Sequence, residues 1–540
     1  FRLRNLFMSS SLTDLVSPLW SWPVSFSSSE NAPEHSAITQ AGRLLVQGLA
    51  QDAFDICDAS IAAISSDGIE PSGDSKLFLS GLFVLRALCC SRIGLQQECM
   101  DDLDLALSFD PNNTDALNTR AMQRLDSGNI DGAFSDIDRA IAVSPDSPRL
   151  YSTRSAIHVT YGDICAARKD CDTIVLLDPE MADAYANRAV CNCLDHPASP
   201  SLALRDINTG ISHDPGNASL YRVRAGVMLL LDRIDDALAD LDQAVTLRPS
   251  DMTLRKKRGD LHKRNHDLTA ALEDFTTVLE HQPDDENTLR QRAEVFAGLE
   301  RWQECIQDLR HLLLSCPECP ELWSSLSRAQ FHFKEFEKCI ESAEHSLSLA
   351  DPSDKDARDD ARYLANSCLG MVAICRSRYE DGARYFTEAL RYDGSAVPAR
   401  ANRAACFANL NKHKEAICDL NKAIKGEPLP ACYLERGRCR DALGQTDAAL
   451  SDFSEAITLD PFCCDAFFTR ALLYSRLNRT EEAITDCNAA IKIDPKHQPS
   501  LKLRDQILAP ERILPPSAKR LRSQRDVFDR ENQQPNPELR

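Results

Sequence analysis

Proline residues recur along this chain at nearly constant intervals, and their spacing constrains the fold more than any other feature. Proline ends an α-helix because its ring blocks the backbone and it has no N–H group. The prolines in question are Pro111, Pro145, Pro179, Pro215, Pro249, Pro283, Pro317, Pro352, Pro428, Pro461 and Pro495. The first gaps are 34, 34, 36, 34, 34, 34 and 35 residues. Such a period indicates a stack of similar units, and 540 residues are too many for one compact core.

Each interval has the same internal pattern. An apolar residue stands at the fourth place, a small residue at the eighth, and a turn residue at the fifteenth. Places 20, 24 and 27 then form one apolar face of a second helix, which the proline ends. In residues 114–145 these places hold Leu117, Ala121, Gly128, Ala133, Ile137 and Ala140. The pattern predicts two helices that approach closely where their residues are small.

This pattern resembles the tetratricopeptide repeat, a helix–turn–helix unit of the same length with small residues at places 8, 20 and 27. The resemblance covers residues 34–495. It implies an all-α fold, namely an α-solenoid (a right-handed superhelix) of about 12–13 repeats. A weaker repeat with Ala53 and Cys57 on its second helix precedes twelve stronger ones. The twelve start at Ser80, Thr114, Pro148, Ala182, Ala218, Met252, Glu286, Pro320, Tyr363, Val397, Pro430 and Cys464.

The repeat boundaries divide the chain into six predicted segments. A charged spacer between two arrays is predicted to act as a hinge or a change of curvature, since it interrupts the period. The segments are a disordered leader (1–33), an N-terminal array of about nine repeats (34–351), the spacer (352–362), a C-terminal array of four repeats (363–496), a capping helix (497–508) and a disordered basic, Pro-rich tail (509–540).

Two charged places vary together. Place 7 is arginine and place 23 is aspartate in the same ten repeats, while the other two have Leu326 with Ser342 and Leu369 with Tyr385. Pairing within one repeat accounts for all ten cases, so we expect salt bridges between the two helices of a repeat, with a structural role. The pairs are Arg86–Asp102, Arg120–Asp136, Arg154–Asp170, Arg188–Asp206, Arg224–Asp240, Arg258–Asp274, Arg292–Asp308, Arg403–Asp419, Arg436–Asp452 and Arg470–Asp486.

A candidate peptide-binding site follows from the resemblance. In this family the first helices line a concave groove, with places 2, 5, 9 and 12 facing it. The middle repeats bring cations to this side, and lined-up cations attract acidic peptides. Asp260 and Glu294 dilute the stripe, and the alternative is an ordinary solvated helix face. The candidate groove residues are Arg222, Lys256, Lys263, Arg264, Arg290 and Arg328.

The family also includes co-chaperones that hold the C-termini of Hsp70 and Hsp90 in a two-carboxylate clamp. The clamp needs lysine and asparagine at places 5 and 9, asparagine at place 6 of the next repeat, then lysine and arginine at places 2 and 6. Asn187 and Asn402 have the middle position. The repeats around Asn187 offer Ser152, Ala156, Ser219 and Val223 at the other places, and those around Asn402 offer Ser367, Met371, Ala431 and Glu435. The clamp is therefore not expected here.

No arrangement of residues predicts catalysis, a metal site or a cofactor. The single C-x-x-C pair, Cys316 and Cys319, has no second pair at zinc spacing, and His262 and His266 stand among cations. With a net charge of −20, nucleic acid and anionic membranes are disfavoured as partners. The irregularly spaced cysteines favour a reducing, cytoplasmic compartment. A basic cluster in the tail, Lys519, Arg520, Arg522 and Arg525, offers nuclear import as the alternative.

These observations predict a non-enzymatic scaffold or adaptor that binds acidic or extended peptide segments of other proteins in the concave groove. One alternative is a co-chaperone that engages chaperones or clients through a surface other than the clamp. Another is the substrate-recruiting arm of an enzyme whose catalytic part lies elsewhere. The oligomeric state and the partner do not follow from the sequence.

Overall fold

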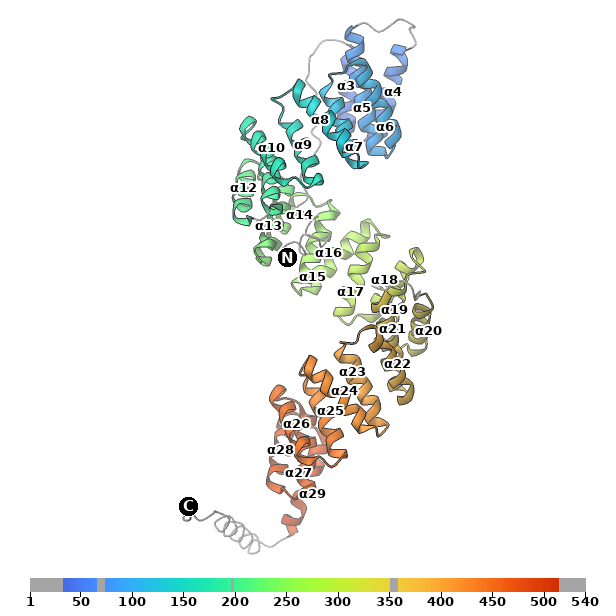
Figure 1. Cartoon of the computed structure of the whole chain (residues 1–540), viewed down its shortest axis with the longest axis vertical. Coiled ribbons are helices and arrows are strands. Elements are labelled where there is room, and N and C mark those ends of the chain that lie inside the picture. Colours follow the sequence, from blue (N-terminus) through green and yellow to red (C-terminus); the bar gives the residue numbers. More distant parts are fainter. Residues whose placement is uncertain (1–32, 66–72, 196–198, 350–357, 514–540) are drawn as a thin grey trace. The chain divides into compact units, whose positions relative to one another are not determined.

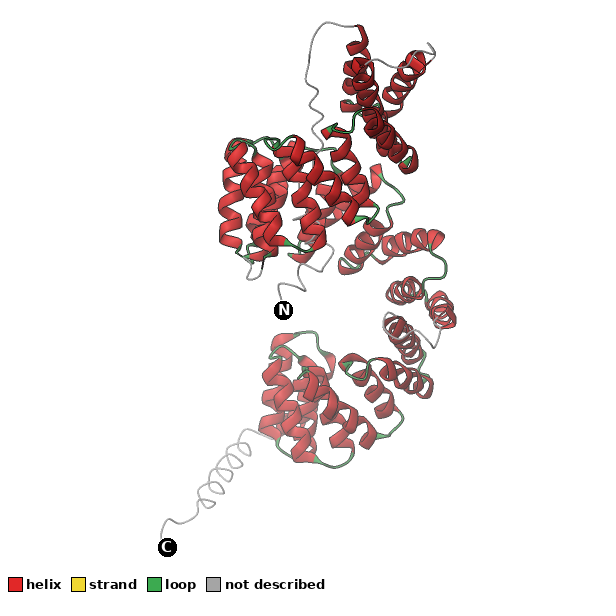
Figure 2. Cartoon of the chain, turned by 45° about the horizontal axis from the view of Figure 1, so that its top comes forward, coloured by secondary structure: helices red, strands yellow, loops and turns green. Residues whose placement is uncertain are grey.

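The computed structural model describes residues 33–65, 73–195, 199–349 and 358–513, and these residues form an all-α solenoid (Figures 1 and 2). Within these ranges there are 27 helices, labelled α3 to α29, and no strand. Helices α3 to α28 form thirteen successive hairpins, and α29 follows the last one. The predicted fold class and repeat number are therefore confirmed.

The two helices of each hairpin occupy equivalent positions along the chain. The first helices are α3 (Pro33–Val46), α5 (Gly73–Ile93), α7 (Thr114–Asp126), α9 (Pro148–Tyr161), α11 (Ala182–Leu194), α13 (Ala218–Leu230), α15 (Met252–Arg264), α17 (Glu286–Gly298), α19 (Pro320–His332), α21 (Arg358–Cys375), α23 (Val397–Asn409), α25 (Pro430–Ala442) and α27 (Cys464–Arg476). The second helices are α4 (Ala50–Ser65), α6 (Gln96–Phe109), α8 (Ile130–Val143), α10 (Ile164–Leu177), α12 (Pro200–His213), α14 (Ile234–Leu247), α16 (Leu268–His281), α18 (Trp302–Ser315), α20 (Phe336–Leu349), α22 (Tyr379–Tyr392), α24 (His413–Gly426), α26 (Thr446–Leu459) and α28 (Thr480–Ile493).

Local sequence sets where these helices begin and end. The Asn113 side chain caps α7 by accepting from the Ala116 N–H, and Asp163 caps α10 through the Ala166 N–H. Before each closing proline an aspartate often turns the chain, as where Asp110 accepts from the Asn112 N–H. Place 15, between the two helices, has a left-handed backbone: Gly128 has φ 78°, and Lys334 has φ 65° in the same role. The turn therefore requires a conformation that glycine adopts most readily.

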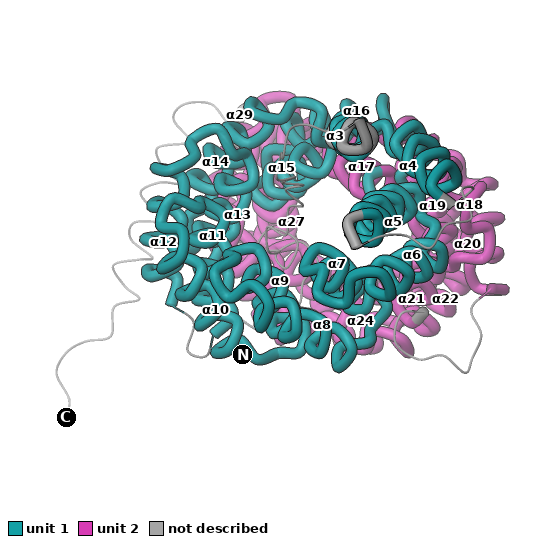
Figure 3. The backbone as a smooth tube through the Cα atoms, turned by 90° about the horizontal axis from the view of Figure 1, so that it is seen from above, with its two compact units in different colours: residues 1–288 teal, residues 289–540 magenta. Residues whose placement is uncertain are grey.

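The described residues fall into two compact units, 1–288 and 289–540, which Figure 3 colours separately. Within unit 1, α5 and α9 both contact α7 directly, and α11 contacts α13. No two second helices of neighbouring repeats in the described chain are packed to a similar extent. Unit 2 repeats this arrangement in α21, α23, α25 and α27. In each unit the first helices thus form the more closely spaced layer.

The core of each hairpin lies where the small residues stand. Ala121, Ala133, Ile137 and Ala140 are all fully buried. Burying this face stabilises the stack, because a single hairpin cannot shield it from water.

Three repeats have glycine at place 8 and phenylalanine at place 24, and these residues complement each other in size. A Cβ placed on Gly437 would lie 2.5 Å from Phe453 Cε1, and one on Gly259 would lie 2.8 Å from Phe275 Cε1. Gly370 stands in the same relation to Phe386. Repeats with alanine at place 8 have smaller residues at place 24, such as Leu420 opposite Ala404. The compensating volumes let the two helices of each repeat pack without overlap.

In all ten repeats with the covarying pair, the arginine forms a bidentate bond to the aspartate of its own repeat. Nε donates to Oδ2 over 2.7–3.0 Å, and Nη2 donates to Oδ1 over 2.5–2.8 Å. The aspartate side chains are only 2–13% exposed. Hydrogen bonds to these aspartates raise the pKa of Arg120, Arg224 and Arg470. The guanidinium therefore holds the two helices of a repeat together as a permanent cation.

The same arginines also reach back to the preceding repeat, at its place 25. In nine of the ten described cases Nη1 bonds to an oxygen acceptor there over 2.6–3.1 Å. The acceptor varies: it is Asp104 for Arg120 but Ser454 for Arg470. We call the resulting set of bonds the arginine ladder and each arginine with its partners a rung. Each of these rungs joins three helices of two repeats.

The spacer and the capping helix are partly described. α21 begins at Arg358, so residues 358–362 of the predicted spacer are helical. Asp359 and Asp360 in its first turn favour a helix N-terminus, and Ala361 is buried. The rest of the predicted spacer and hinge, residues 352–357, lies outside the described residues. The predicted leader before Pro33 and the tail after Ile513 also lie outside them.

The cap is longer than its predicted range of 497–508, since α29 spans Gln498–Ile513. Its Leu503 packs against Ala471 and Cys487 of the last repeat. The final hairpin is thereby covered on its outer side.

Removing one rung in unit 1 tests the ladder. Arg224→Leu alone leaves Asp240 buried without its cation, which we expect to lower the free energy of unfolding by about 3–5 kcal/mol. Adding Asp240→Ser to Arg224→Leu should recover part of that loss, since no buried charge remains. Thermal melts followed by circular dichroism, with hydrogen exchange of α13 and α14, measure both variants. The single variant Asp240→Ser completes the cycle, and a loss in the double variant equal to the sum of the two single losses would show that the bridge contributes no coupling.

Replacing a packed glycine tests the volume compensation. Gly437→Ala should lower the free energy of unfolding by about 1–3 kcal/mol, because the added methyl group overlaps the Phe453 ring. In the double variant Gly437→Ala/Phe453→Leu the loss should be smaller than the sum of the two single losses. Additive losses in a double-mutant cycle would contradict the argument.

Candidate functional site

The six candidate groove residues are divided between the two units. Arg222 lies on α13, and Lys256, Lys263 and Arg264 lie on α15, all in unit 1. The other two, Arg290 on α17 and Arg328 on α19, belong to unit 2. We therefore treat them as two sets. The first set is the larger, and we call it the basic face of unit 1.

Helix α15 gives the basic face its charge. Its sequence MTLRKKRGDLHKR has six lysine and arginine residues in 13 positions and one acidic residue, Asp260. Leu254, Gly259 and Leu261 are buried on its packed side. Lys256 and Lys263 are seven residues apart, so they lie on one side of the helix, two turns apart. Of these six cations, only Arg258 forms the bidentate bond of the arginine ladder.

Some of these cations have partners in the chain. The Lys256 ammonium donates to Asp285 over 2.7 Å, and about a quarter of each side chain is exposed. Burial of Asp285 raises its pKa, but hydrogen bonds from Lys256 and Thr288 outweigh this and lower the pKa below its ordinary value. Arg264 is exposed and forms no hydrogen bond or ion pair with any other residue that the structure describes. A bound carboxylate would thus meet Arg264 without first breaking a bridge.

The clamp position is occupied by a buried residue. Asn187 on α11 is only 3% exposed, so its side chain does not face a ligand. The other clamp places around Asn187 hold Ser152, Ala156, Ser219 and Val223. Ser152 and Ala156 lie on α9, and Ser219 and Val223 lie on α13. These side chains supply no cation for a terminal carboxylate.

The described ranges contain no group of three or more His, Cys, Asp and Glu residues that could hold a metal ion. The Cys319 thiol donates to Glu321 over 2.9 Å. His262 and His266 do not share a helix: α15 ends at Arg264, and His266 lies in the turn with φ 61°. The spacing of four therefore does not bring the two rings onto one face of a helix.

Most cysteines are buried in repeat cores as free thiols. Burial raises the pKa of Cys57, Cys99 and Cys193 to about 12, so these thiols stay protonated and weakly reactive at neutral pH. No described helix is both long and apolar enough to span a membrane.

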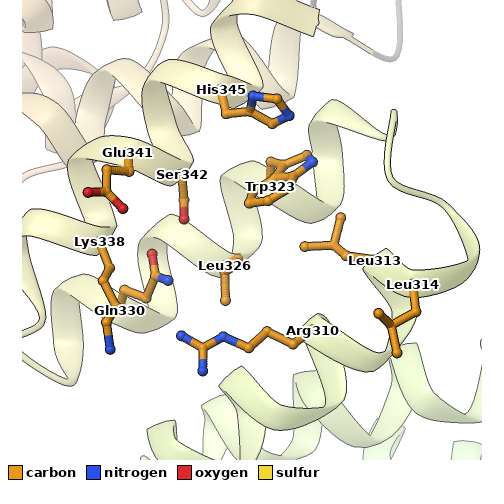
Figure 4. A pocket seen from close by; sticks show the side chains of 10 residues that line it. All are labelled: Arg310, Leu313, Leu314, Trp323, Leu326, Gln330, Lys338, Glu341, Ser342 and His345. Carbon is orange, nitrogen blue, oxygen red and sulfur yellow. The ribbon is translucent and has the colours of Figure 1, made fainter.

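Sequence analysis missed one concave feature, a pocket of about 640 Å³ in unit 2 (Figure 4). It lies between the neighbouring second helices α18 and α20, over α19. Two of its residues, Leu326 and Ser342, are those that replace a ladder pair, so their joint departure from the pattern was the available signal. The other lining residues are Arg310, Leu313, Leu314, Trp323, Gln330, Lys338, Glu341 and His345.

Comparisons with known proteins agree with the repeat geometry. Models of the tetratricopeptide repeat match residues 369–429, 430–463 and 464–497. Hsp70-Hsp90 organizing protein 3 of Arabidopsis thaliana is 22% identical over 212 residues, covering 34% of this chain and 38% of that protein. Human tetratricopeptide repeat protein 34 is 36% identical over 84 residues, 15% of each chain. The human mitochondrial import receptor subunit TOM70 is 40% identical over 50 residues, 9% of this chain and 8% of that one. The chain thus spans well under half the length of these curated relatives.

Among solved structures, Cut9 in its complex with Hcn1 aligns over 88% of this chain and 97% of its own, with 12% identity and a TM-score of 0.40. Yeast Tom70 aligns over 93% and 99%, with 13% identity and a TM-score of 0.37. Scores this low carry no argument, so the assignment depends on the family models and on the thirteen hairpins. On that basis, the chain is a multi-repeat tetratricopeptide-repeat protein.

Proposed function

We propose that this protein is a protein-binding adaptor that holds an extended acidic segment of a partner against the basic face of unit 1. The observation that carries the proposal is the cationic helix α15 within a chain of net charge −20. A cluster of one sign in a protein of the opposite sign attracts complementary ligands over a long range. Arg222 on the neighbouring first helix α13 extends the cluster across two repeats.

The end of α15 makes this face suited to carboxylates. His262, Lys263 and Arg264 occupy the last turn. Cations at a helix C-terminus also interact favourably with the helix dipole, a contribution of about 0.3–1 kcal/mol. That contribution needs only one or two cations, whereas α15 carries them along its whole length. A ligand with several carboxylates spaced along an extended backbone fits this distribution.

A second candidate function is a co-chaperone role through a surface other than the clamp. The similarity to Hsp70-Hsp90 organizing protein 3 favours it, although it covers 34% of this chain. The two proposals differ in the surface that binds: the co-chaperone would engage a chaperone or client through a surface other than the clamp, whereas the adaptor binds side-chain carboxylates of an extended segment on the basic face.

Charge reversal tests the basic face. The variant Lys256→Glu/Lys263→Glu/Arg264→Glu should bind a fluorescein-labelled peptide, Glu-Ser-Leu-Glu repeated three times, about tenfold more weakly than the unmodified chain. For the unmodified chain the affinity should fall with added salt, as screening predicts, and the variant should lose this dependence. Fluorescence anisotropy measures both quantities, and circular dichroism checks the helix content.

A matched control makes the same change in net charge elsewhere. Arg139, Lys169 and Arg205 are exposed on the second helices α8, α10 and α12 of unit 1. The variant Arg139→Glu/Lys169→Glu/Arg205→Glu should keep the affinity of the unmodified chain within about twofold, because charges on the other layer act only through the screened general field. If both triple variants weaken binding equally, the basic face has no specific role.

Amidation of the probe tests whether the basic face binds side-chain carboxylates or a free C-terminal carboxylate. Binding on the basic face should be the same within about twofold for the peptide with a free C-terminus and for its C-terminal amide, since no clamp side chains are present. Competition anisotropy with the two unlabelled peptides measures the ratio. A loss of about tenfold on amidation would instead indicate recognition of the terminal carboxylate.

A further inference from the structure

The pocket of unit 2 exists because one rung of the arginine ladder is missing. In an intact rung the place-7 guanidinium fills the space between the first helix and the second helices on both sides. In the repeat beginning at Pro320, Leu326 stands at place 7 and Ser342 at place 23, and both line the pocket. The leucine is shorter than arginine and the serine is smaller than aspartate, so the volume stays open (Figure 4).

The third position of the rung has also changed, from an acceptor to a cation. Place 25 of the preceding repeat is Asp104, Asp138, Asp172 or Asp242 at four intact rungs. Here it is Arg310, whose exposed side chain forms no ion pair or hydrogen bond with any residue of the described ranges. The four intact rungs have a carboxylate at this place, whereas the missing rung has the unpaired guanidinium of Arg310 beside the pocket. Among the other charged lining residues, Lys338 is paired with Glu335 over 2.7 Å, and Glu341 is the single acid.

A buried amide stands at place 11 of the repeat that lacks the rung. In three intact rungs a polar residue at this place bonds the aspartate of place 23: Arg124 donates to Asp136, Asn192 donates to Asp206, and Arg440 pairs with Asp452. At the missing rung the residue is Gln330, which is 2% exposed and whose Oε1 accepts no hydrogen bond. Figure 4 shows its amide directed toward the space beside Ser342 and Leu326. A buried amide without partners is costly, so this group is available to a ligand.

The next repeat also lacks a rung but closes the space with its own side chain. There Leu369 stands at place 7 and Tyr385 at place 23, and both belong to one apolar cluster with Ala343 and Ala365. Loss of the ladder pair therefore does not by itself require an open pocket. At place 23 the next repeat fills this volume with Tyr385. The smaller Ser342 leaves the volume open in the repeat that begins at Pro320.

The walls of the pocket suit an apolar side chain. Leu313 and Leu326 form apolar parts of the wall. The Trp323 indole is held in place, because its N–H donates to the Pro317 carbonyl over 2.8 Å and its ring meets His345 edge-on at 4.5 Å. A volume of about 640 Å³ exceeds one side chain and has room for a short stretch of peptide. Tryptophan in such a position is a common centre of binding energy.

We propose that this pocket is a second protein-binding site, which takes an extended segment of a partner that has an apolar side chain next to a carboxylate. The apolar side chain packs on Trp323 and Leu326, the carboxylate pairs with Arg310, and the Gln330 amide bonds the segment's backbone. On α19 the lining residues Trp323, Leu326 and Gln330 stand at places 4, 7 and 11, which are not groove places. The site thus belongs to another layer and another unit than the basic face, and neither proposal depends on the other.

Restoring the rung is the sharpest test. The variant Arg310→Asp/Leu326→Arg/Ser342→Asp fills the pocket with the chain's own guanidinium and should keep or raise the melting temperature. Phage displaying random 12-residue peptides are selected on the full chain and counter-selected on this variant. Enriched peptides should place an acidic residue next to an aromatic or aliphatic one. As synthetic peptides they should bind the variant about tenfold or more weakly in anisotropy titrations.

Two simpler variants keep the test valid if the restored rung does not fold. Arg310→Glu changes an exposed residue and should remove the preference for acidic peptides, whereas Trp323→Ala should weaken all enriched peptides about tenfold or more. Lys263→Glu/Arg264→Glu, on the basic face, should leave their affinity unchanged. The proposal is overturned if the selection yields no discriminating peptide, if enriched peptides lack the acidic–apolar pair, or if Arg310→Glu binds them as tightly as the unmodified chain.

Discussion

The arginine ladder is the interaction on which this solenoid depends most. A guanidinium offers donors in a fixed planar fork, so two bonds to one carboxylate set its orientation and leave Nη1 directed elsewhere. In nine rungs Nη1 reaches the preceding repeat, so one side chain fixes both the pairing of two helices and their position against the preceding hairpin. Small core residues allow the helices to approach, and the ladder determines how they approach.

The period of the prolines was enough to predict the fold, because the hairpins repeat one apolar face and twelve of the thirteen described hairpins share a left-handed residue in the turn. The partner at place 23 was also visible, since arginine and aspartate disappear together in two repeats. The partner at place 25 was not, because Asp104, Asn208, Thr387 and Ser454 all serve as acceptors for Nη1. Because any side-chain oxygen at place 25 can accept the hydrogen bond from Nη1, the residue type there varies and shows no pattern in the sequence.

The pairing of Gly437 with Phe453 shows a second limit of the sequence. A small residue at place 8 is expected in every repeat, but the choice of glycine over alanine depends on the residue sixteen positions later. Gly259 and Gly370 make the same choice opposite Phe275 and Phe386. The sizes of the residues at places 8 and 24 compensate each other, and this can be recognised only when the two places are known to be in contact. The candidate groove residues all lie on first helices, four in unit 1 and two in unit 2, and a continuous stripe across them stays a prediction.

A repeated structure carries specificity at the places where the repeat fails. Intact rungs are alike, so they satisfy their own charges and offer a partner little to recognise. Loss of a rung affects three positions at once, because in an intact rung the arginine, its aspartate and the acceptor of the preceding repeat are bonded to one another. In the repeat that begins at Tyr363 a tyrosine closes the gap, and the solenoid gains only an apolar contact. In the repeat before it, the serine leaves a volume, the acceptor has become Arg310, and Gln330 keeps an amide oxygen without a donor. Three substitutions that would each be unfavourable in an intact rung are compatible here because they occur together, and together they produce a site with apolar walls, a cation and a hydrogen-bonding group.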